Sequence, residues 1–410
     1  MNHTRKRPQI AVLVVAASLL AAPMALADAV TDWNIKAGEI VVEAKLPTPP
    51  ANRVLAIAQT AVYEAVNAIT KVYPDSELQL EAASGASVEA AIAAANHATL
   101  AKLLPSQQAA IDTAYHAALA GITDGSAKTD GIAVGDKAAA AILAERTDDG
   151  AATQETYRPH TTAGVYVPTV IPAVPQWPRR KPWLMTSAAQ FRPGPPPALT
   201  SEVWARDYAE IKALGGKNST ERTAKQTEIA SFWEATQPPI YHGVVRSVAN
   251  MPGREVTQNA RLFVAVTQAV DDAMIAVFDA KYHHGFWRPI TAIRNGHDGN
   301  DATTREAGWT PFIDTPMHPE YPCAHCIVSS SMGAVLAAEI GAGPAPRLSS
   351  ASPTAQGAVR TWASVDEFTR EVALARIYDG VHYRNSTVVG SAMGKKIGEL
   401  AVQSFSKPAR

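Results

Sequence analysis

Apolar residues recur at intervals of three and four along most of this chain, which is the period of an amphipathic α-helix. The first clear series runs from Val54 to Ile69 and predicts a helix there. Similar alanine-rich series, separated by proline or by glycine and aspartate, predict helices at about 87–104, 106–121 and 132–146. The amino-terminal half is therefore predicted to be a helical bundle.

The helical period returns in the second half of the chain. It predicts helices at about 201–213, 222–235, 257–281, 324–341, 364–378 and 383–403. Segments that alternate apolar and polar residues with a period of two, as half-buried strands do, are scarce. We therefore predict an all-α fold of two packed helical bundles.

A proline-rich segment separates these two halves. Nine prolines lie between Pro168 and Pro197, a density that excludes a helix. The segment also contains Trp177 and Trp183, which argue against a solvated linker, so we expect an ordered surface loop near a cleft. The predicted organisation is a first bundle at 28–157, this loop at 158–200 and a second bundle at 201–410.

Residues 1–27 have the layout of a cleaved secretory signal. Basic residues at Arg5–Arg7 precede an apolar run, and Ala25-Leu26-Ala27 stands before Asp28, as at a signal cleavage site. We therefore expect a mature chain that starts at Asp28 and is exported to the periplasm or secreted. No later segment approaches the roughly 20 apolar residues that a membrane span requires.

Composition excludes several classes of partner. The chain has 37 basic and 38 acidic residues and a formal net charge of −1, so it has no broad positive surface for nucleic acid. Any attraction for an anion must be local. Two cysteines cannot form a disulfide framework in a chain of this size, so stability depends on packing.

Four predicted helices carry a basic or imidazole residue where the apolar stripe meets the helix end. Two stripes end at Lys281 and Arg376, and two others begin at His325 and His382. A buried cation is costly without an anionic partner. The free N–H groups at helix N-termini also attract an oxyanion.

Arg288 completes this set, because it follows Lys281 by seven residues and precedes Pro289. Taken singly, each residue more often has an ordinary role, such as a snorkelling lysine or a satisfied core histidine. The joint pattern of Lys-x6-Arg-Pro, Pro-x-x-His and Arg-x5-His is improbable by accident. It predicts one shared oxyanion site.

These three patterns, in this order, resemble the motifs of the vanadium-dependent haloperoxidases and their relatives, the type 2 phosphatidic acid phosphatases and bacterial acid phosphatases. They read KYHHGFWRP from Lys281, PCAH from Pro322 and RIYDGVH from Arg376. The sequence Phe286-Trp287-Arg288-Pro289 is more similar to the haloperoxidase branch than to the membrane phosphatases. The resemblance covers about 259–403 and implies an anion site at the helix ends of the carboxy-terminal bundle.

The resemblance also implies a role for each motif residue. Lys281, Arg288 and Arg376 would hold the equatorial oxygens of vanadate or phosphate. His382 would be the axial ligand of vanadium, or the nucleophile toward phosphate, and His325 the acid/base opposite it. His318 stands where bromide- or iodide-using members tend to have histidine, and Trp287 is expected to pack near the anion.

The preferred interpretation is a haloperoxidase that uses vanadate as cofactor and oxidises a halide with peroxide. The second is a phosphatase that hydrolyses phosphate esters through a phosphohistidine, where the same cations stabilise the transferring group. The third is a non-catalytic oxyanion-binding helical protein. Retention of both histidines argues against the third, because binding alone could use the cations. In all three interpretations the partners are small molecules.

The chain departs from the family at Cys323 and Ala324, where serine and glycine would stand. The main-chain N–H of Ala324 can still meet an oxyanion, whereas Cys323 would offer only a weak thiol donor. A thiol beside peroxide is liable to oxidation, which counts against haloperoxidase turnover. The Cys323-x-x-Cys326 spacing also permits a small disulfide. A thioredoxin-like redox site lacks its βαβ setting, and a zinc site with His318 and His325 lacks a second ligand pair.

Overall fold

The computed structural model describes residues 28–74, 76 and 78–405. The predicted signal segment, 1–27, lies outside these described residues. The described chain is mainly helical, and the predicted all-α class of two packed bundles is confirmed. The α-helices are α1 Ala29–Glu43, α2 Thr48–Thr70, α3 Val88–Leu103, α4 Gln108–Ala120, α5 Ser126–Glu145, α6 Glu202–Leu214, α7 Ala224–Trp233, α8 Pro238–Ala249, α9 Val256–His284, α10 Pro289–Asn295, α11 Ala324–Ile340, α12 Val365–Tyr378 and α13 Arg384–Phe405.

Three of these helices were not predicted from the sequence: α1, α8 and α10. The hairpin of β1 (Leu348–Ser352) and β2 (Ala358–Trp362) was also missed. Its strands are antiparallel, with Leu348 opposite Trp362. Strand β1 reads Leu-Ser-Ser-Ala-Ser, so it has no apolar alternation by which sequence could reveal it.

Helix α9 is the central element of the molecule. It contacts α2 of the amino-terminal bundle as well as α11 and α13 of the carboxy-terminal bundle. Every residue from Leu262 to Lys281 is buried, as expected of a helix covered on all sides. Lys281, in the last turn of this helix, therefore lies in the protein interior.

Helices α11 and α13 pack closely because glycines line their contact. A β-carbon added at Gly394 would lie 2.2 Å from the carbonyl oxygen of Ile327, and one added at Gly398 would lie 2.2 Å from that of Ser331. Both distances are shorter than any normal carbon–oxygen contact. Side chains at these positions would push α11 away, and α11 carries His325 in its first turn.

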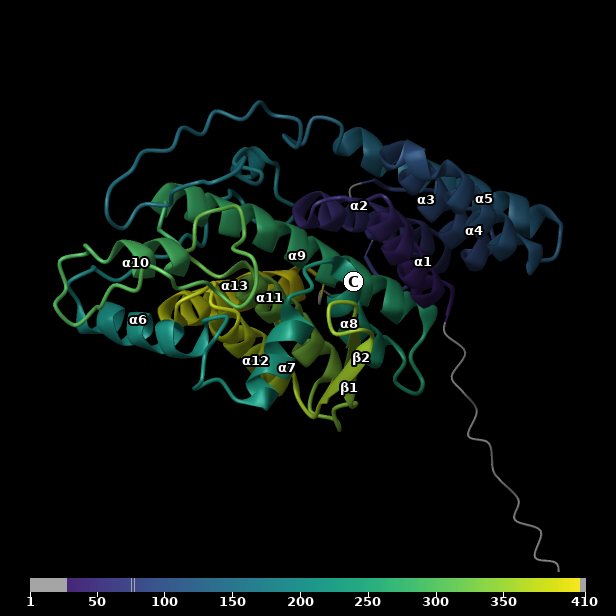
Figure 1. The fold of residues 1–410 in the computed structure, drawn as a ribbon. Coiled ribbons are helices and arrows are strands. Elements are labelled where there is room, and N and C mark those ends of the chain that lie inside the picture. Colours follow the sequence, from purple (N-terminus) through teal and green to yellow (C-terminus); the bar gives the residue numbers. More distant parts are fainter. Residues whose placement is uncertain (1–27, 75, 77, 406–410) are drawn as a thin grey trace, which may run out of the picture.

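Residues 146–201, which we call the strap, connect α5 to α6 and cross the molecule over α9 (Figure 1). The strap contains no α-helix and only one short 3₁₀ turn, Trp177–Arg179. Its buried Arg180 forms ion pairs with Asp149 (2.8 Å) and with Asp271 of α9 (2.6 Å). The neighbouring Asp272 accepts hydrogen bonds from the main-chain N–H groups of strap residues 183–185. The strap is therefore fixed to α9 by buried polar contacts.

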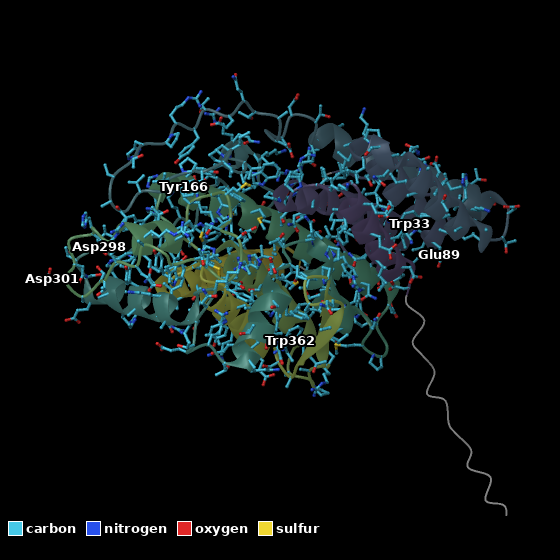
Figure 2. The ribbon with its side chains drawn as sticks, in the orientation of Figure 1. Trp33, Glu89, Tyr166, Asp298, Asp301 and Trp362 are labelled. Carbon is cyan, nitrogen blue, oxygen red and sulfur yellow. A yellow bond between two sulfur atoms is a disulfide. The ribbon has the colours of Figure 1, made fainter. Side chains whose placement is uncertain are left out.

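A second set of contacts joins the strap to the segment after α9. Tyr166 of the strap, labelled in Figure 2, donates its main-chain N–H to the carbonyl of Gly285 at 2.7 Å. Figure 2 also places Asp298 and Asp301, in the loop after α10, at the opposite end of the molecule from Glu89 of α3. In that loop Asp298 accepts from the indole Nε1 of Trp204 at 2.7 Å, which ties the loop to α6.

Candidate active site

The first motif is a helix end followed directly by a helix start. Lys281 lies in the last turn of α9, which stops at Gly285 in the left-handed conformation (φ 58°). Arg288 is the N-cap of α10. Both cations donate to main-chain carbonyls of residues 318–320, directly before the second motif. Both side chains are buried.

The second motif forms the start of α11. Cys323 is the N-cap, Ala324 is the first helical residue, and His325 follows in the first turn. Cys323 and Cys326 are joined by a disulfide, and Cys323 Sγ accepts the main-chain N–H of Cys326 at 3.2 Å. The N–H groups of a first helical turn have no partner within the helix, so the main chain at Ala324 can meet an anion.

The third motif spans the turn between α12 and α13. Arg376 lies in the last turn of α12, and His382 precedes the start of α13. The turn requires Gly380, which has a φ of +78° and whose added β-carbon would lie 2.2 Å from the carbonyl oxygen of Gly215. The main-chain N–H of His382 donates to the carbonyl of Arg376 at 3.2 Å, which holds the two side chains of this motif in one place.

The structure brings the five predicted site residues into one neighbourhood. Arg288 Nη1 lies 3.4 Å from His382 Nε2. Lys281 Nζ donates to the main-chain carbonyls of Pro319 (3.0 Å) and Glu320 (2.8 Å), just before α11. His325, His382 and Arg376 line a common cavity of about 250 Å³. We call Lys281, Arg288, Arg376, His325 and His382 the oxyanion cluster.

Glu320 is a site residue that the sequence analysis missed. Its carboxylate Oε1 accepts from His382 Nδ1 at 2.7 Å and from the main-chain N–H of Tyr383 at 3.1 Å. Because the main-chain N–H of Tyr383 donates to this same oxygen, Oε1 is an acceptor, so His382 carries its proton on Nδ1 and directs an Nε2 lone pair away from Glu320. That is the tautomer required of a nucleophile or an axial ligand.

His318 also lies at the site. It lines the cavity, its Nδ1 lies 3.0 Å from Arg288 Nη2, and its carbonyl accepts from Arg288 Nε at 2.9 Å. Trp287 does not reach the cavity. It is buried in an aromatic cluster with Trp204, to which it stacks at 6.0 Å.

Electrostatics at the cluster favour an anion. Burial lowers the pKa of Lys281 well below its ordinary value, and the nearby positive charge of Arg288 adds to the shift. Burial also lowers the pKa of Arg288 to about 10. Burial and the cation Arg288 keep the pKa of His382 low, and burial and Arg376 do so for His325. A bound anion would offset the repulsion between these groups.

Two carboxylates lie among these cations. Burial raises the pKa of Glu320 to about 7, against the opposing effect of Lys281 and Arg288. Burial likewise raises the pKa of Asp379 to about 7, against its 2.6 Å ion pair with Arg376. Neither carboxylate lines the cavity. The ionisable side chains that line the cavity are those of Arg376, Tyr241 and three histidines, whereas Lys281 and Arg288 lie behind its surface.

Unpartnered polar atoms show that the site fits an oxyanion. Within the described residues, neither His325 Nε2 nor Arg376 Nε has a hydrogen-bond partner, although both atoms are buried. Buried polar atoms are normally paired, so these two are suited to a ligand. No group of three or more His, Cys, Asp or Glu side chains in the described part could hold a metal ion directly. Vanadate needs no such group, since cations would bind its oxygens.

One predicted contact needs correction. Cys323 was expected to offer an S–H donor to the oxyanion, but its sulfur is bonded to Cys326 and carries no hydrogen. Its main-chain N–H is also occupied, because it donates to the carbonyl of Ser386 at 3.2 Å. Ala324, which lines the cavity, remains the predicted main-chain donor.

The strap and α2 complete the cavity. Ala173 and Val174 of the strap line it, as do residues near the start of α2. The main-chain N–H of Ala173 donates to the carbonyl of Met317 at 2.6 Å, so the strap is joined to the segment that holds His318. Among the described helices, none is both long and apolar enough to span a bilayer.

Comparison with known proteins agrees with this geometry. Residues 261–410, which include the whole oxyanion cluster, match the family model described as the VCPO second helical-bundle domain. The vanadium chloroperoxidase of Curvularia inaequalis is 28% identical over 164 residues. That match spans 33% of this chain and only 27% of the length of the relative.

Two solved structures share the fold over most of the chain. The structure of a bacterial vanadium-dependent iodoperoxidase has a TM-score of 0.79 and 24% identity, and the match covers 93% of this chain and 96% of that one. A holo-type bacterial vanadium-dependent chloroperoxidase has a TM-score of 0.70 and 17% identity, with coverages of 88% and 93%. These two likenesses show a shared fold. The resemblance that the three motifs indicate is confirmed by the match of residues 261–410 to the VCPO second helical-bundle domain and by the match to the vanadium chloroperoxidase.

Proposed function

We propose that this protein is a vanadate-dependent haloperoxidase that oxidises a halide with hydrogen peroxide. The observation that carries the proposal is the pairing of His382 with Glu320, which leaves His382 Nε2 unprotonated beside three buried cations. The family match and the shared fold support the same interpretation.

Each residue of the oxyanion cluster would have a separate role. Lys281, Arg288 and Arg376 would bind the oxygens of vanadate by charge, with help from the main-chain N–H at Ala324. His382 would ligate the vanadium through Nε2. Vanadate, when bound, would supply a Lewis acid that activates peroxide toward a halide. His325 would accept a proton from the incoming peroxide, a role supported by its buried Nε2, which has no protein partner among the described residues.

An activity comparison tests the proposal. Residues 28–410 are purified, freed of bound oxyanion, and assayed for peroxide-dependent oxidation of iodide, bromide and chloride with and without orthovanadate. Hydrolysis of an aryl phosphate is measured in parallel. Halide oxidation that requires vanadate supports the proposal. Phosphate release that vanadate inhibits would replace it with a phosphatase, and vanadate binding without either activity would leave an oxyanion-binding protein.

Two single-histidine variants make the test specific. His382→Ala removes the proposed ligand and should abolish vanadate-dependent halide oxidation. His116→Ala is the matched control, because His116 is exposed on α4, away from the cavity. Full activity in His382→Ala would refute the assigned role.

We also propose that the mature protein is exported, on the basis of the signal-like pattern of residues 1–27. Export predicts that protein made with its own leader starts at or close to Asp28. Amino-terminal sequencing of material recovered from the periplasm or the medium tests this, and a retained Met1 would contradict it.

A further inference from the structure

Two methionines line the cavity beside the oxyanion cluster. Met274 lies on α9, and Met317 directly precedes His318. The same cavity is lined by His325 and His382, where the proposed function would generate an oxidised halogen. Neither thioether has a part in oxyanion binding or in the proposed proton transfer. Both are therefore unexplained by the proposed function, although both face the place where its oxidant would form.

The two methionines lie at different depths. Met317 is 49% exposed, so it marks the place where the cavity meets solvent, whereas Met274 is only 5% exposed. Because the cavity has a volume of only about 250 Å³, an oxidant formed beside His382 meets the cavity walls before it meets bulk water. An oxidised halogen that leaves by this mouth therefore encounters thioether sulfur on its way out.

A thioether is the lining group that reacts most readily with such an oxidant. Its sulfur is soft and polarizable, and methionine is commonly oxidised to its sulfoxide. No cysteine is among the cavity-lining residues of the described chain, and Cys323 and Cys326 are joined in a disulfide. The phenol of Tyr241 also lines the cavity, but burial raises its pKa and keeps it in the less reactive neutral form.

We propose that Met274 and Met317 are sites of oxidative modification, which return oxidised halogen to halide inside the cavity and become sulfoxides. This inference rests on the proposed haloperoxidase function, which supplies the oxidant. It assigns the protein a second reaction, carried out on its own side chains, that disposes of oxidised halogen before it reaches bulk water.

The reaction balances without any further oxidant. Peroxide, halide and one proton first give hypohalous acid and water. The sulfur lone pair then takes the halogen as the oxygen–halogen bond breaks and hydroxide leaves. Water next forms the sulfur–oxygen bond and releases two protons, one of which neutralises the hydroxide, while halide departs with the electron pair of the sulfur–halogen bond. The sum is peroxide and thioether giving water and sulfoxide, with two electrons passing from sulfur to peroxide.

The chain contains matched methionines outside the cavity. Met251, in the turn after α8, is part-exposed, and Met185 of the strap is 5% exposed, as Met274 is. Neither is among the cavity-lining residues of the described chain. Oxidation from bulk solvent would follow exposure, so it would favour Met317 and Met251 over the two buried residues. Oxidation from within the cavity would instead favour Met274 over Met185 and Met317 over Met251.

Peptide mapping by mass spectrometry after turnover tests the proposal. The vanadate-loaded mature chain is given peroxide and the halide that it oxidises fastest, with an excess of a methionine-containing peptide too large for the cavity. That scavenger peptide consumes oxidant released to solvent. A second sample is treated with reagent hypohalous acid of the same halogen. We expect the ratio of sulfoxide at Met274 to sulfoxide at Met185 to be at least tenfold higher after turnover than after the reagent.

The scavenger peptide reports on the proposed function in the same samples. If it gains no sulfoxide that requires both vanadate and halide, the haloperoxidase function itself has failed. If it is oxidised while Met274 and Met317 show only the pattern left by the reagent, the further inference is overturned. Equal oxidation of these two methionines when halide is omitted would also overturn it, because peroxide would then act on them without halogen.

A methionine introduced into the cavity wall tests the location. Phe278→Met places a thioether at a buried, cavity-lining position of α9, and that thioether should be oxidised during turnover. Phe263→Met is the matched control, since Phe263 is a buried residue of the same helix that does not line the cavity. Equal sulfoxide levels at the two introduced methionines would show that oxidation does not begin in this cavity.

Discussion

Replacing Glu320 separates two effects that this buried carboxylate has on oxyanion affinity. Glu320 accepts hydrogen bonds from His382 Nδ1 and from the main-chain N–H of Tyr383, which orients His382. Its negative charge also opposes binding of an anion nearby. Glu320→Ala removes both effects, whereas Glu320→Gln keeps a hydrogen-bond acceptor and removes only the charge.

The two effects have opposite signs and can be estimated. A unit charge at about 7 Å in an effective dielectric constant of about 20 contributes about 2 kcal/mol, so loss of charge alone would strengthen vanadate binding. Loss of a carboxylate that supports a ligating histidine typically weakens affinity by about 10–100-fold, or about 1.4–2.7 kcal/mol. In Glu320→Ala the imidazole loses its orientation, and two buried donors lose their acceptor at about 1–3 kcal/mol each.

We therefore expect Glu320→Gln to bind vanadate at least as tightly as the unmodified protein. Glu320→Ala should bind it about tenfold or more weakly and should be less stable to urea. Titration calorimetry or ⁵¹V NMR on the vanadate-free proteins measures the affinities. Glu339→Gln is the control, because Glu339 pairs with Arg254 and Arg261 away from the cavity. Unchanged affinity in Glu320→Ala would refute the positioning argument.

Three further predictions concern stability and oxidation. Burial lowers the pKa of His242 to about 3. The stability that neutral His242 gives the folded state is therefore fully present above about pH 6.5 and is lost as the pH falls below that value. In urea unfolding, the free energy of unfolding of the unmodified protein minus that of His242→Gln should decrease by about 2 kcal/mol between pH 7.5 and pH 5. A difference that does not change with pH would contradict this. Arg180→Met leaves the buried Asp271 without an ion-pair partner and Asp149 with Arg53 alone, so it should lower the unfolding free energy by about 3–5 kcal/mol. A loss below about 1 kcal/mol would show that other contacts hold the strap. Cys326→Ala frees the Cys323 thiol, so activity should decay during turnover with peroxide and halide, unlike that of Cys323→Ser/Cys326→Ala; equal decay would refute the reasoning.

Periodicity could predict two cations of the site, Lys281 and Arg376, because each lies at the end of an apolar stripe. Lys281 and Arg376 occupy core positions of their helices, and both are buried as expected. Glu320 could not be found in this way. It lies in an irregular segment with prolines on both sides, where spacing carries no information about direction. The sequence nevertheless contained a clue to Glu320. It is a single carboxylate directly before the second motif, where the surrounding residues are expected to be buried.

Other parts of the fold were hidden for different physical reasons. Helix α8 begins with Pro238-Pro239, which is read as a break, although proline is favoured in the first turn of a helix. Asp271 and Asp272 of α9 are fully buried because the strap covers them. From sequence alone, an aspartate in a helix is expected to face solvent. Sequence does not reveal that a segment distant in the chain covers that face and pairs with the carboxylate. The attachment of the strap was therefore invisible before the structure.

The disulfide changes the balance between the two enzymatic interpretations. A free thiol at Cys323 would precede the cavity-lining Ala324 and would be liable to oxidation by peroxide, and that argued against haloperoxidase turnover. With both sulfurs bonded and fully buried, the site has no thiol to lose. The disulfide also closes the first turn of α11, which holds Ala324 and His325 at the cavity. A phosphatase would gain the same rigidity but has no need of protection from an oxidant. The replacement of a serine by a bonded cysteine is thus easier to understand in a site that works with peroxide.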